Sequence, residues 1–153
     1  MKLFIIRHGE CEEGFDDAAR ALTPEGIQDI HHLQATFSKL NIKPDLVLVS
    51  PFRRAQETAA ILNQFWNLLP VTVSWLEPST SVSRVLQELK PYESDAIVLV
   101  SHMPLLGHLA GALIEGIPAP TFLIHRGECL ELELDKTEPG SARLLQKITP
   151  SSK

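Results

Sequence analysis

The chain has few of the features that would take it out of the ordinary globular class. It contains only two cysteines, Cys11 and Cys129, too few for a disulfide framework or a cysteine zinc site. No apolar run approaches the roughly 20 residues of a membrane span, and the N-terminal apolar run is too short for a signal peptide. We therefore expect a reduced, cytoplasmic protein that does not enter a membrane.

The sequence also lacks a strong excess of charge of one sign. Its formal net charge is -5, from 14 Lys and Arg against 19 Asp and Glu. No basic stripe accompanies the aromatic residues, so neither nucleic acid nor an anionic lipid surface is an expected partner. Any anion that this protein binds must therefore be held by a local site.

What the chain does have is the length and composition typical of one domain. It has 153 residues, of which 44% are hydrophobic and 22% charged, with no repeat and no interior linker. We predict a single domain over residues 1–150 and a frayed C-terminus over 151–153. The expected oligomeric state is a monomer or a weak dimer.

Apolar, β-favouring segments alternate with amphipathic segments along the chain. We expect strands at 2–7, 45–49, 71–75 and 96–100, and helices at about 24–40, 50–66, 82–89 and from 104 onward. Near the C-terminus, strands at 121–124 and 130–134 are expected to flank a turn at 125–127, with a further strand at 142–148. This order predicts an α/β three-layer sandwich, with a mostly parallel central sheet, helices on both faces and a C-terminal β-hairpin.

Histidine and arginine residues follow three of the predicted strands. Arg7 and His8 end the first, Arg53 and Arg54 follow the second, and His102 follows the fourth. Ligands of open parallel sheets bind beyond the carboxyl ends of the strands, where these side chains should meet. Arginine forks match phosphate oxygens, and a neutral imidazole is a competent nucleophile for phosphorus. We therefore predict a phosphate site in which neighbouring arginines keep His8 neutral.

Four segments resemble, in order and spacing, the motifs of the histidine phosphatase superfamily, whose fold is phosphoglycerate mutase-like. Residues 7–10 match its RHG signature, 22–26 its LTxxG element, 50–58 its SxxxRAxxT element, and 101–107 the element that carries a second histidine. The short chain and its LVSPFxRA and SHxPLxG phrases are most similar to the small SixA-type phosphohistidine phosphatases.

The resemblance implies an enzyme, a metal-independent phosphatase in which His8 accepts the phosphoryl group. Arg7, Arg54 and His102 would surround the phosphate or another oxyanion, and water would then release phosphate from His8. No metal or other cofactor is implied, because fixed cations supply the charge that Mg²⁺ would supply. The implied substrate is phosphohistidine on a partner protein, such as a histidine phosphotransfer domain, which places the protein in signal transduction.

The sequence leaves the general acid open. Larger family members that cleave phosphate esters use a carboxylic acid from a region that is shortened here. Glu77 is the first candidate by position and Glu10 the second, although we favour the interpretation of Glu77 as a solvated loop glutamate. An imidazole leaving group, whose conjugate acid has a pKa of about 6.5, departs more easily than an alkoxide and tolerates a site without an acid.

The sequence also offers two candidate substrate contacts and two alternative functions. Arg20, in the loop before the first helix, and Arg53 are candidate substrate contacts. The alternatives are a small-molecule phosphomonoesterase or mutase of the same superfamily, and a non-catalytic module that binds phosphate or a phosphoprotein. The presence of His8 and His102 argues against a module, because binding alone needs arginine but no nucleophile.

Overall fold

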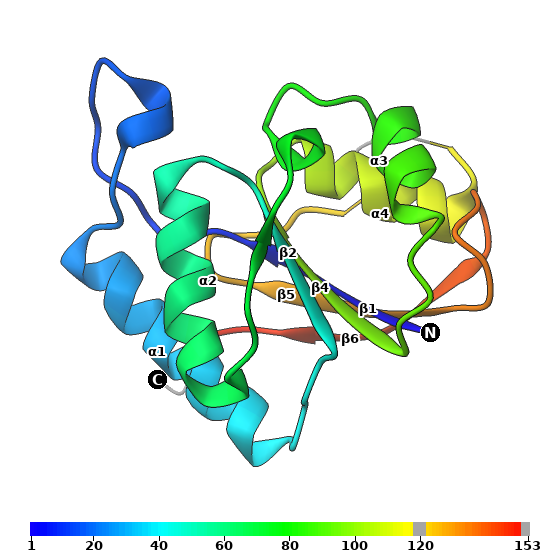
Figure 1. Ribbon diagram of the computed structural model, residues 1–153, viewed down its shortest axis with the longest axis horizontal. Coiled ribbons are helices and arrows are strands. Elements are labelled where there is room, and N and C mark those ends of the chain that lie inside the picture. The colour runs from blue at the N-terminus through cyan, green and yellow to red at the C-terminus, as the bar shows by residue number, and fades with distance from the viewer. Residues whose placement is uncertain (118–121, 151–153) are drawn as a thin grey trace.

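The computed structural model describes residues 1–117 and 122–150, so the frayed end predicted at 151–153 lies outside the described residues (Figure 1). Six strands form one sheet in the order β3-β2-β4-β1-β5-β6. The first four strands pair in parallel: β1 (Lys2–Arg7), β2 (Leu46–Val49), β3 (Val71–Thr72) and β4 (Ala96–Ser101). The last two, β5 (Cys129–Leu134) and β6 (Ala142–Ile148), are added antiparallel and form the C-terminal hairpin.

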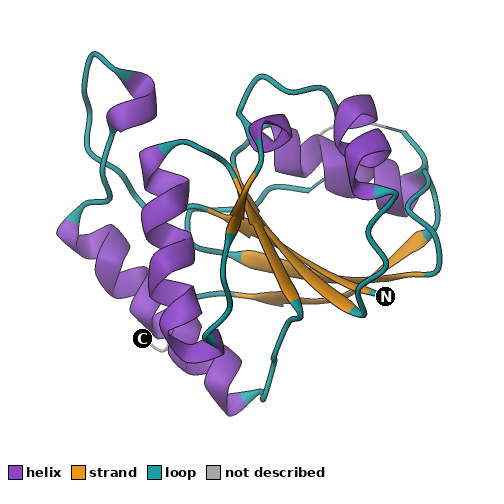
Figure 2. Cartoon of the chain, viewed as in Figure 1, coloured by secondary structure: helices purple, strands orange, loops and turns teal. Residues whose placement is uncertain are grey.

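Helices cover both faces of the sheet, which confirms the predicted three-layer α/β architecture (Figures 1 and 2). One face carries α1 (Pro24–Lys39) and α2 (Arg53–Trp66), and the other carries α3 (Val82–Leu89) and α4 (Leu105–Glu115). Two 3-10 turns, η1 (Asp17–Ala19) and η2 (Ser74–Leu76), lie in connecting segments. Within residues 1–117 and 122–150, no helix combines the length and apolar character that a bilayer crossing requires.

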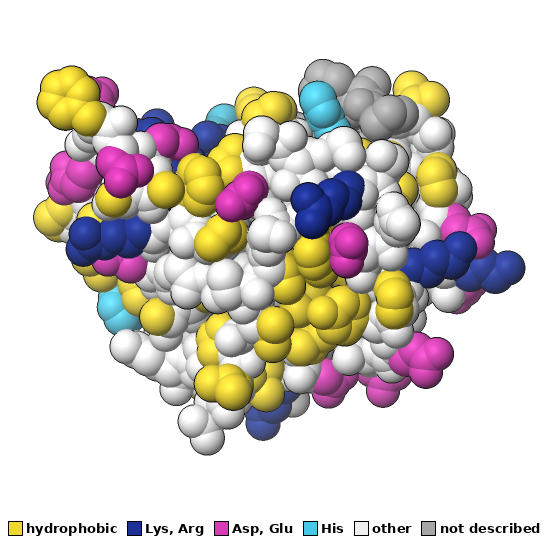
Figure 3. Space-filling view, turned by 45° about the horizontal axis from the view of Figure 1, so that its top comes forward, with side chains coloured by type: hydrophobic (Ala, Val, Ile, Leu, Met, Phe, Trp, Pro, Cys, Tyr) yellow, Lys and Arg dark blue, Asp and Glu magenta, His cyan; other side chains and the backbone are white. Residues whose placement is uncertain are grey.

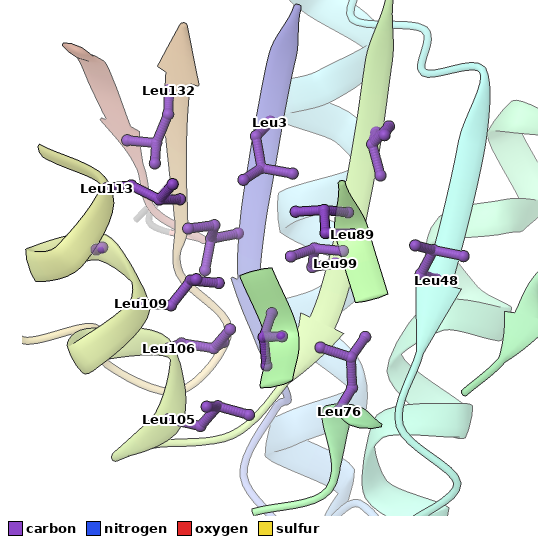
Figure 4. Packing of buried hydrophobic residues seen from close by; sticks show 14 of the residues in the cluster. Leu3, Leu48, Leu76, Leu89, Leu99, Leu105, Leu106, Leu109, Leu113 and Leu132 are labelled. Atoms are coloured by element: carbon purple, nitrogen blue, oxygen red, sulfur yellow. The ribbon is translucent and has the colours of Figure 1, made fainter. Parts of the chain in front are cut away.

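The central strands are apolar on both faces because each face is covered by helices. Along β1, Leu3 and Ile5 pack into the core under α3 and α4, whereas Phe4 and Ile6 pack into the core under α1 and α2. Figure 4 shows the first of these cores, where leucines of α4 approach those of the sheet. The alternating burial fixes the strand register, since a shift by one residue would exchange the two faces.

The helix starts differ in how they are capped. Thr23 caps α1 as its sequence indicates: its Oγ1 accepts the Gly26 N–H at 3.0 Å, and Pro24 is the first helical residue. By contrast, α2 begins at Arg53, three residues later than the Ser50-Pro51 signal suggests, with no side-chain cap. Ser50 is therefore available for another role.

Two predicted strands differ from the structure. The third strand is only two residues long, because Ser74–Leu76 turns into η2 and buries its apolar side chains. The strand expected at 121–124 is wrong for residues 122–124, and residue 121 lies outside the described residues. The Gly127 N–H donates to the carbonyl oxygens of Arg7 and His8, and Arg7 Nη1 donates to the Ile124 carbonyl. These contacts hold the segment across the end of β1, so β6 takes the place of the expected hairpin partner.

Candidate active site

The register of the parallel strands brings two histidines together at the carboxyl edge of the sheet. Arg7 of β1 is paired with Ser101 of β4, so the residues that follow, His8 and His102, are neighbours. The His8 N–H donates to the Ser101 carbonyl at 3.1 Å, and the centroids of the two imidazole rings are 5.1 Å apart. Residues 94 positions apart in the sequence thus share one edge because two strands share one register.

His8 is held as a neutral imidazole with a defined tautomer. Its Nδ1 lies 2.7 Å from the Gly9 carbonyl oxygen, which can only accept, so we assign the ring proton to Nδ1. The lone pair on Nε2 faces Arg54, whose Nε donates to it at 3.3 Å. Burial is the main cause that lowers the pKa of His8 to about 4, and the charges of Arg54 and Arg7 add to it, whereas the bond to Gly9 opposes it. A basic nitrogen is therefore present at neutral pH.

His102 is anchored by the serine that precedes α2. Its Nε2 lies 2.8 Å from Ser50 Oγ. Its ring packs edge-on against the ring of Phe52, with 5.2 Å between the two ring centroids. Ser50 Oγ accepts the Phe52 N–H at 3.2 Å and still has its own proton, which it can donate to His102 Nε2 when the imidazole proton is on Nδ1. Burial first, then the proximity of His8 and Arg54, lowers the pKa of His102 to about 3.

Arg54 lies in the first turn of α2 and is buried between that helix and the loop of residues 9–22. Its Nη1 donates to the Asp17 carbonyl oxygen at 2.7 Å, and its Nη2 lies 3.3 Å from Asp17 Oδ2. The guanidinium carbon lies 4.9 Å from the centre of the Phe52 ring. Arg20 first, and Arg54 to a smaller extent, lower the pKa of Asp17. Asp17 is a site residue that sequence reasoning missed; its only signal is the acidic run around it.

Two buried nitrogens at this edge lack a hydrogen-bond partner among the described residues. They are Arg7 Nε and His102 Nδ1. Arg7 is otherwise held by its Nη1, which donates to the Ile124 carbonyl at 2.9 Å. Buried polar groups normally have partners, and an N–H of this kind matches an oxygen of an anion.

These groups line a cavity of about 590 Å³. Its lining consists of four arginines, two histidines, two glutamates, a cysteine and a methionine: Arg7, Arg20, Arg54, Arg126, His8, His102, Glu10, Glu13, Cys11 and Met103. A second cavity of about 420 Å³ lies at the opposite edge of the sheet, beside Met1 and Asp95, and contains neither arginine nor histidine. The cavity at the carboxyl edge therefore combines arginines and histidines in the way that suits a phosphoryl group.

The four principal predicted residues, Arg7, His8, Arg54 and His102, converge on this cavity. Arg20 also lines it and is held in place by the Glu12 carbonyl oxygen at 2.6 Å and by Asp17 at 2.8 Å. Arg126, whose only sequence signal was its place in the 125–127 turn, adds a fourth arginine. The structure thus adds Arg126 to the arginines that were predicted for the site.

Two other candidates lie outside the cavity lining. The Arg53 side chain is 57% exposed and pairs with Glu57, at 3.1 Å, along α2. Glu77 follows η2 and is not a lining residue, whereas Glu10, the second candidate for a general acid, is. In the described part of the chain, no group of three or more His, Cys, Asp or Glu side chains is placed to hold a metal ion.

Comparison with known proteins agrees with this geometry. Residues 3–76 match the model of the histidine phosphatase superfamily (branch 1). The chain is 31% identical over 129 residues to phosphohistidine phosphatase SixA of Escherichia coli, covering 80% of each chain. It is 35% identical over 127 residues to a SixA homolog of Haemophilus influenzae, covering 74% of this chain and 77% of the homolog.

Solved structures with the same fold are also phosphatases. The structure of the protein histidine phosphatase SixA complexed with tungstate superposes with a TM-score of 0.86 at 26% identity, over 98% of this chain and 97% of that one. An α-ribazole phosphatase from Shigella flexneri shares the fold, with a TM-score of 0.81 at 22% identity, over 99% of this chain and 96% of that one. On the identity, coverage and motifs together, the chain belongs to the histidine phosphatase superfamily.

Proposed function

We propose that this protein is a metal-independent phosphatase that removes the phosphoryl group from phosphohistidine on a partner protein, with His8 as the acceptor. The observation that carries the proposal is the lone pair of His8 Nε2, oriented by Gly9 at the edge of a cavity lined by four arginines. Its relatives in Escherichia coli and Haemophilus influenzae are named as phosphohistidine phosphatases, which supports the substrate class.

In the first step, the Nε2 lone pair of His8 attacks phosphorus in line with the leaving group. A new N–P bond forms as the N–P bond of the substrate breaks, and its electron pair returns to the substrate imidazole, which takes a proton from water. Arg7, Arg54 and His102 Nδ1–H would stabilise the charge on the equatorial oxygens. For this to happen, Arg54 Nε must release the His8 Nε2 lone pair, and the phosphate must replace or share the contact that Asp17 makes with Arg54.

In the second step, water attacks the phosphorus of phosphorylated His8. The O–P bond forms, the N–P bond to His8 breaks, and inorganic phosphate leaves, so that Nε2 regains its lone pair. The low pKa of His8, about 4, favours breaking of the N–P bond, since a weakly basic imidazole is a good leaving group.

A protein-borne phosphohistidine fits this site better than a phosphate ester. The leaving imidazole needs no dedicated acid, and Glu77 does not line the cavity. Glu13, one of the lining residues, is exposed, so a side chain on another protein can reach the cavity from this side. Glu10 and Glu13 are the lining carboxyl groups, and ester cleavage would have to rely on one of them.

The test is to trap the intermediate. The protein is mixed with a ³²P-labelled histidine phosphotransfer domain, quenched in base, in which phosphohistidine survives, and analysed for label on the enzyme. We expect a labelled adduct and phosphate release from wild type, and neither from His8→Ala. His31→Ala, which removes an exposed histidine of α1, should behave as wild type.

Substrate class is tested in parallel with a panel of sugar phosphates. Faster turnover of any sugar phosphate than of the phosphohistidine protein would reject the proposed substrate while leaving the His8 intermediate intact. Transfer of label from His8 to a sugar instead of to water would indicate a mutase. Binding of phosphate without any adduct would indicate a binding module.

A further inference from the structure

A single aromatic side chain projects from the loop that borders the active-site cavity. Phe15 is 113% exposed, the highest value among the large hydrophobic side chains of the described residues. Figure 1 shows the loop of residues 9–22 standing away from the sandwich beyond the ends of α1 and α2. A phenylalanine held wholly in water gains free energy when a partner covers it.

The surface around Phe15 is continuous with the active site. A hollow of about 600 Å³ is lined by Glu13, Gly14, Phe15 and Arg20. Two of these residues, Glu13 and Arg20, also line the cavity that contains His8. A macromolecule that places a phosphohistidine in that cavity must therefore lie beside Phe15, whereas a small substrate need not reach it.

Hydrogen bonds hold the base of the loop in place. The Glu12 N–H donates to the Ala21 carbonyl at 2.7 Å, and the Leu22 N–H donates to Glu57 of α2 at 2.7 Å. Arg20 closes the loop through its bonds to Glu12 and Asp17. A loop that is held at its base loses less conformational entropy on association than a loop that is free.

Charge around Phe15 identifies the chemistry of the partner. The sequence from Glu12 to Asp17 reads EEGFDD, and among described residues the side chains of Glu12, Glu13 and Asp16 form no ion pair. Figure 3 shows acidic side chains gathered over this projecting loop around hydrophobic atoms at its tip. Such a surface complements an apolar patch rimmed by lysine or arginine.

We propose that Phe15 and its acidic neighbours form a docking surface for the phosphohistidine-bearing partner, which presents an apolar patch with basic side chains beside its phosphorylated histidine. The inference rests on the proposed function, since it assigns the protein partner of the same site. Recognition then has two parts: the arginine cavity takes the phosphoryl group, and the loop selects the protein that carries it.

The first experiment compares a protein substrate with a small one that contains the same bond. Phosphate release is measured from a panel of histidine-phosphorylated histidine phosphotransfer domains and from free phosphohistidine. In Phe15→Ser we expect kcat/KM for the domains to fall at least about tenfold, the effect of truncating an aromatic anchor. For free phosphohistidine, kcat/KM should stay within about twofold of wild type, because its ligand contacts lie in the cavity.

The matched control is Leu69→Ser. Leu69 is 87% exposed and lies after the C-terminal end of α2, about 20 Å from the active-site end of that 14-residue helix. It removes a comparable exposed apolar side chain without touching the loop. We expect it to leave kcat/KM for both substrates unchanged.

A second variant tests the charge. The double variant Glu12→Lys/Asp16→Lys should lower kcat/KM for the domains and make that kcat/KM less dependent on salt concentration. For free phosphohistidine, the salt dependence of kcat/KM should be the same as in wild type. Both side chains are exposed, and neither lines the His8 cavity.

Each outcome has one meaning. Equal losses for both substrates in Phe15→Ser would place Phe15 in the catalytic site and overturn the docking surface. No loss for the domains would overturn it as well. A third outcome is that wild type hydrolyses free phosphohistidine at least as fast as it hydrolyses every phosphorylated domain. In that case the assignment of a protein substrate is wrong, and the proposed function fails together with the docking surface.

Discussion

The protonation of His8 should follow its burial rather than the ordinary behaviour of an imidazole. His8 is 6% exposed, and burial is the main cause that lowers its pKa to about 4 from a usual value of 6.5. Because the neutral ring is the nucleophile in the proposed mechanism, this pKa sets the acid limit of the first step.

The lowered and the usual pKa of His8 predict very different fractions of neutral imidazole at mildly acidic pH. With a pKa of about 4, about 99% of His8 is neutral at pH 6, whereas with a pKa of 6.5 only about 24% is neutral. The fraction of competent enzyme should therefore be almost constant between pH 8 and pH 6, instead of falling about fourfold.

The measurement is a titration followed by ¹⁵N NMR of the imidazole nitrogens, with His8→Asn used to assign the His8 signals. We expect the Nε2 signal to stay at its neutral position down to about pH 5 and to move near pH 4. The same titration in urea is the control, since an unfolded histidine titrates at about 6.5. A folded-state midpoint at or above 6 would refute the reasoning that burial keeps the nucleophile neutral.

Three further predictions concern the support of the site. Ser50→Ala should lower kcat about tenfold with KM little changed, because it leaves His102 in place but removes the Ser50 Oγ that anchors its ring; wild-type kcat would contradict this role. Gly26→Ala should lower the free energy of unfolding in urea by about 2 kcal/mol or more, since a Cβ would overlap the Glu10 carbonyl oxygen. Gly14→Ala, with 3.6 Å of room, should change it little, and equal losses would refute the argument. Finally, both buried histidines have lowered pKa values, so the unfolded chain binds more protons below pH 6.5. The free energy of unfolding should be constant above pH 6.5 and decrease toward pH 4 by at most about 1.4 kcal/mol per pH unit for each imidazole. A midpoint of urea unfolding that does not change with pH would contradict this.

Much of the architecture was predictable because its signals are local. The apolar runs at 2–7 and 96–100 form β1 and β4, and Thr23-Pro24 starts α1. Where the signal was ambiguous, packing decided. Ser74–Leu76 looks like the end of a strand, but it forms η2 because Trp75 and Leu76 reach the core that way.

The sequence by itself determined which residues could do the chemistry: Arg7, His8, Arg54 and His102 stand at strand and helix boundaries whose common edge follows from a parallel sheet. Only the tertiary structure decided their surroundings. The loop folds back to put Asp17 on Arg54, 37 residues away, and the segment before β5 puts the Ile124 carbonyl on Arg7, 117 residues away. Strand and helix signals depend on neighbouring residues, whereas such contacts depend on register and loop closure, which no local pattern encodes.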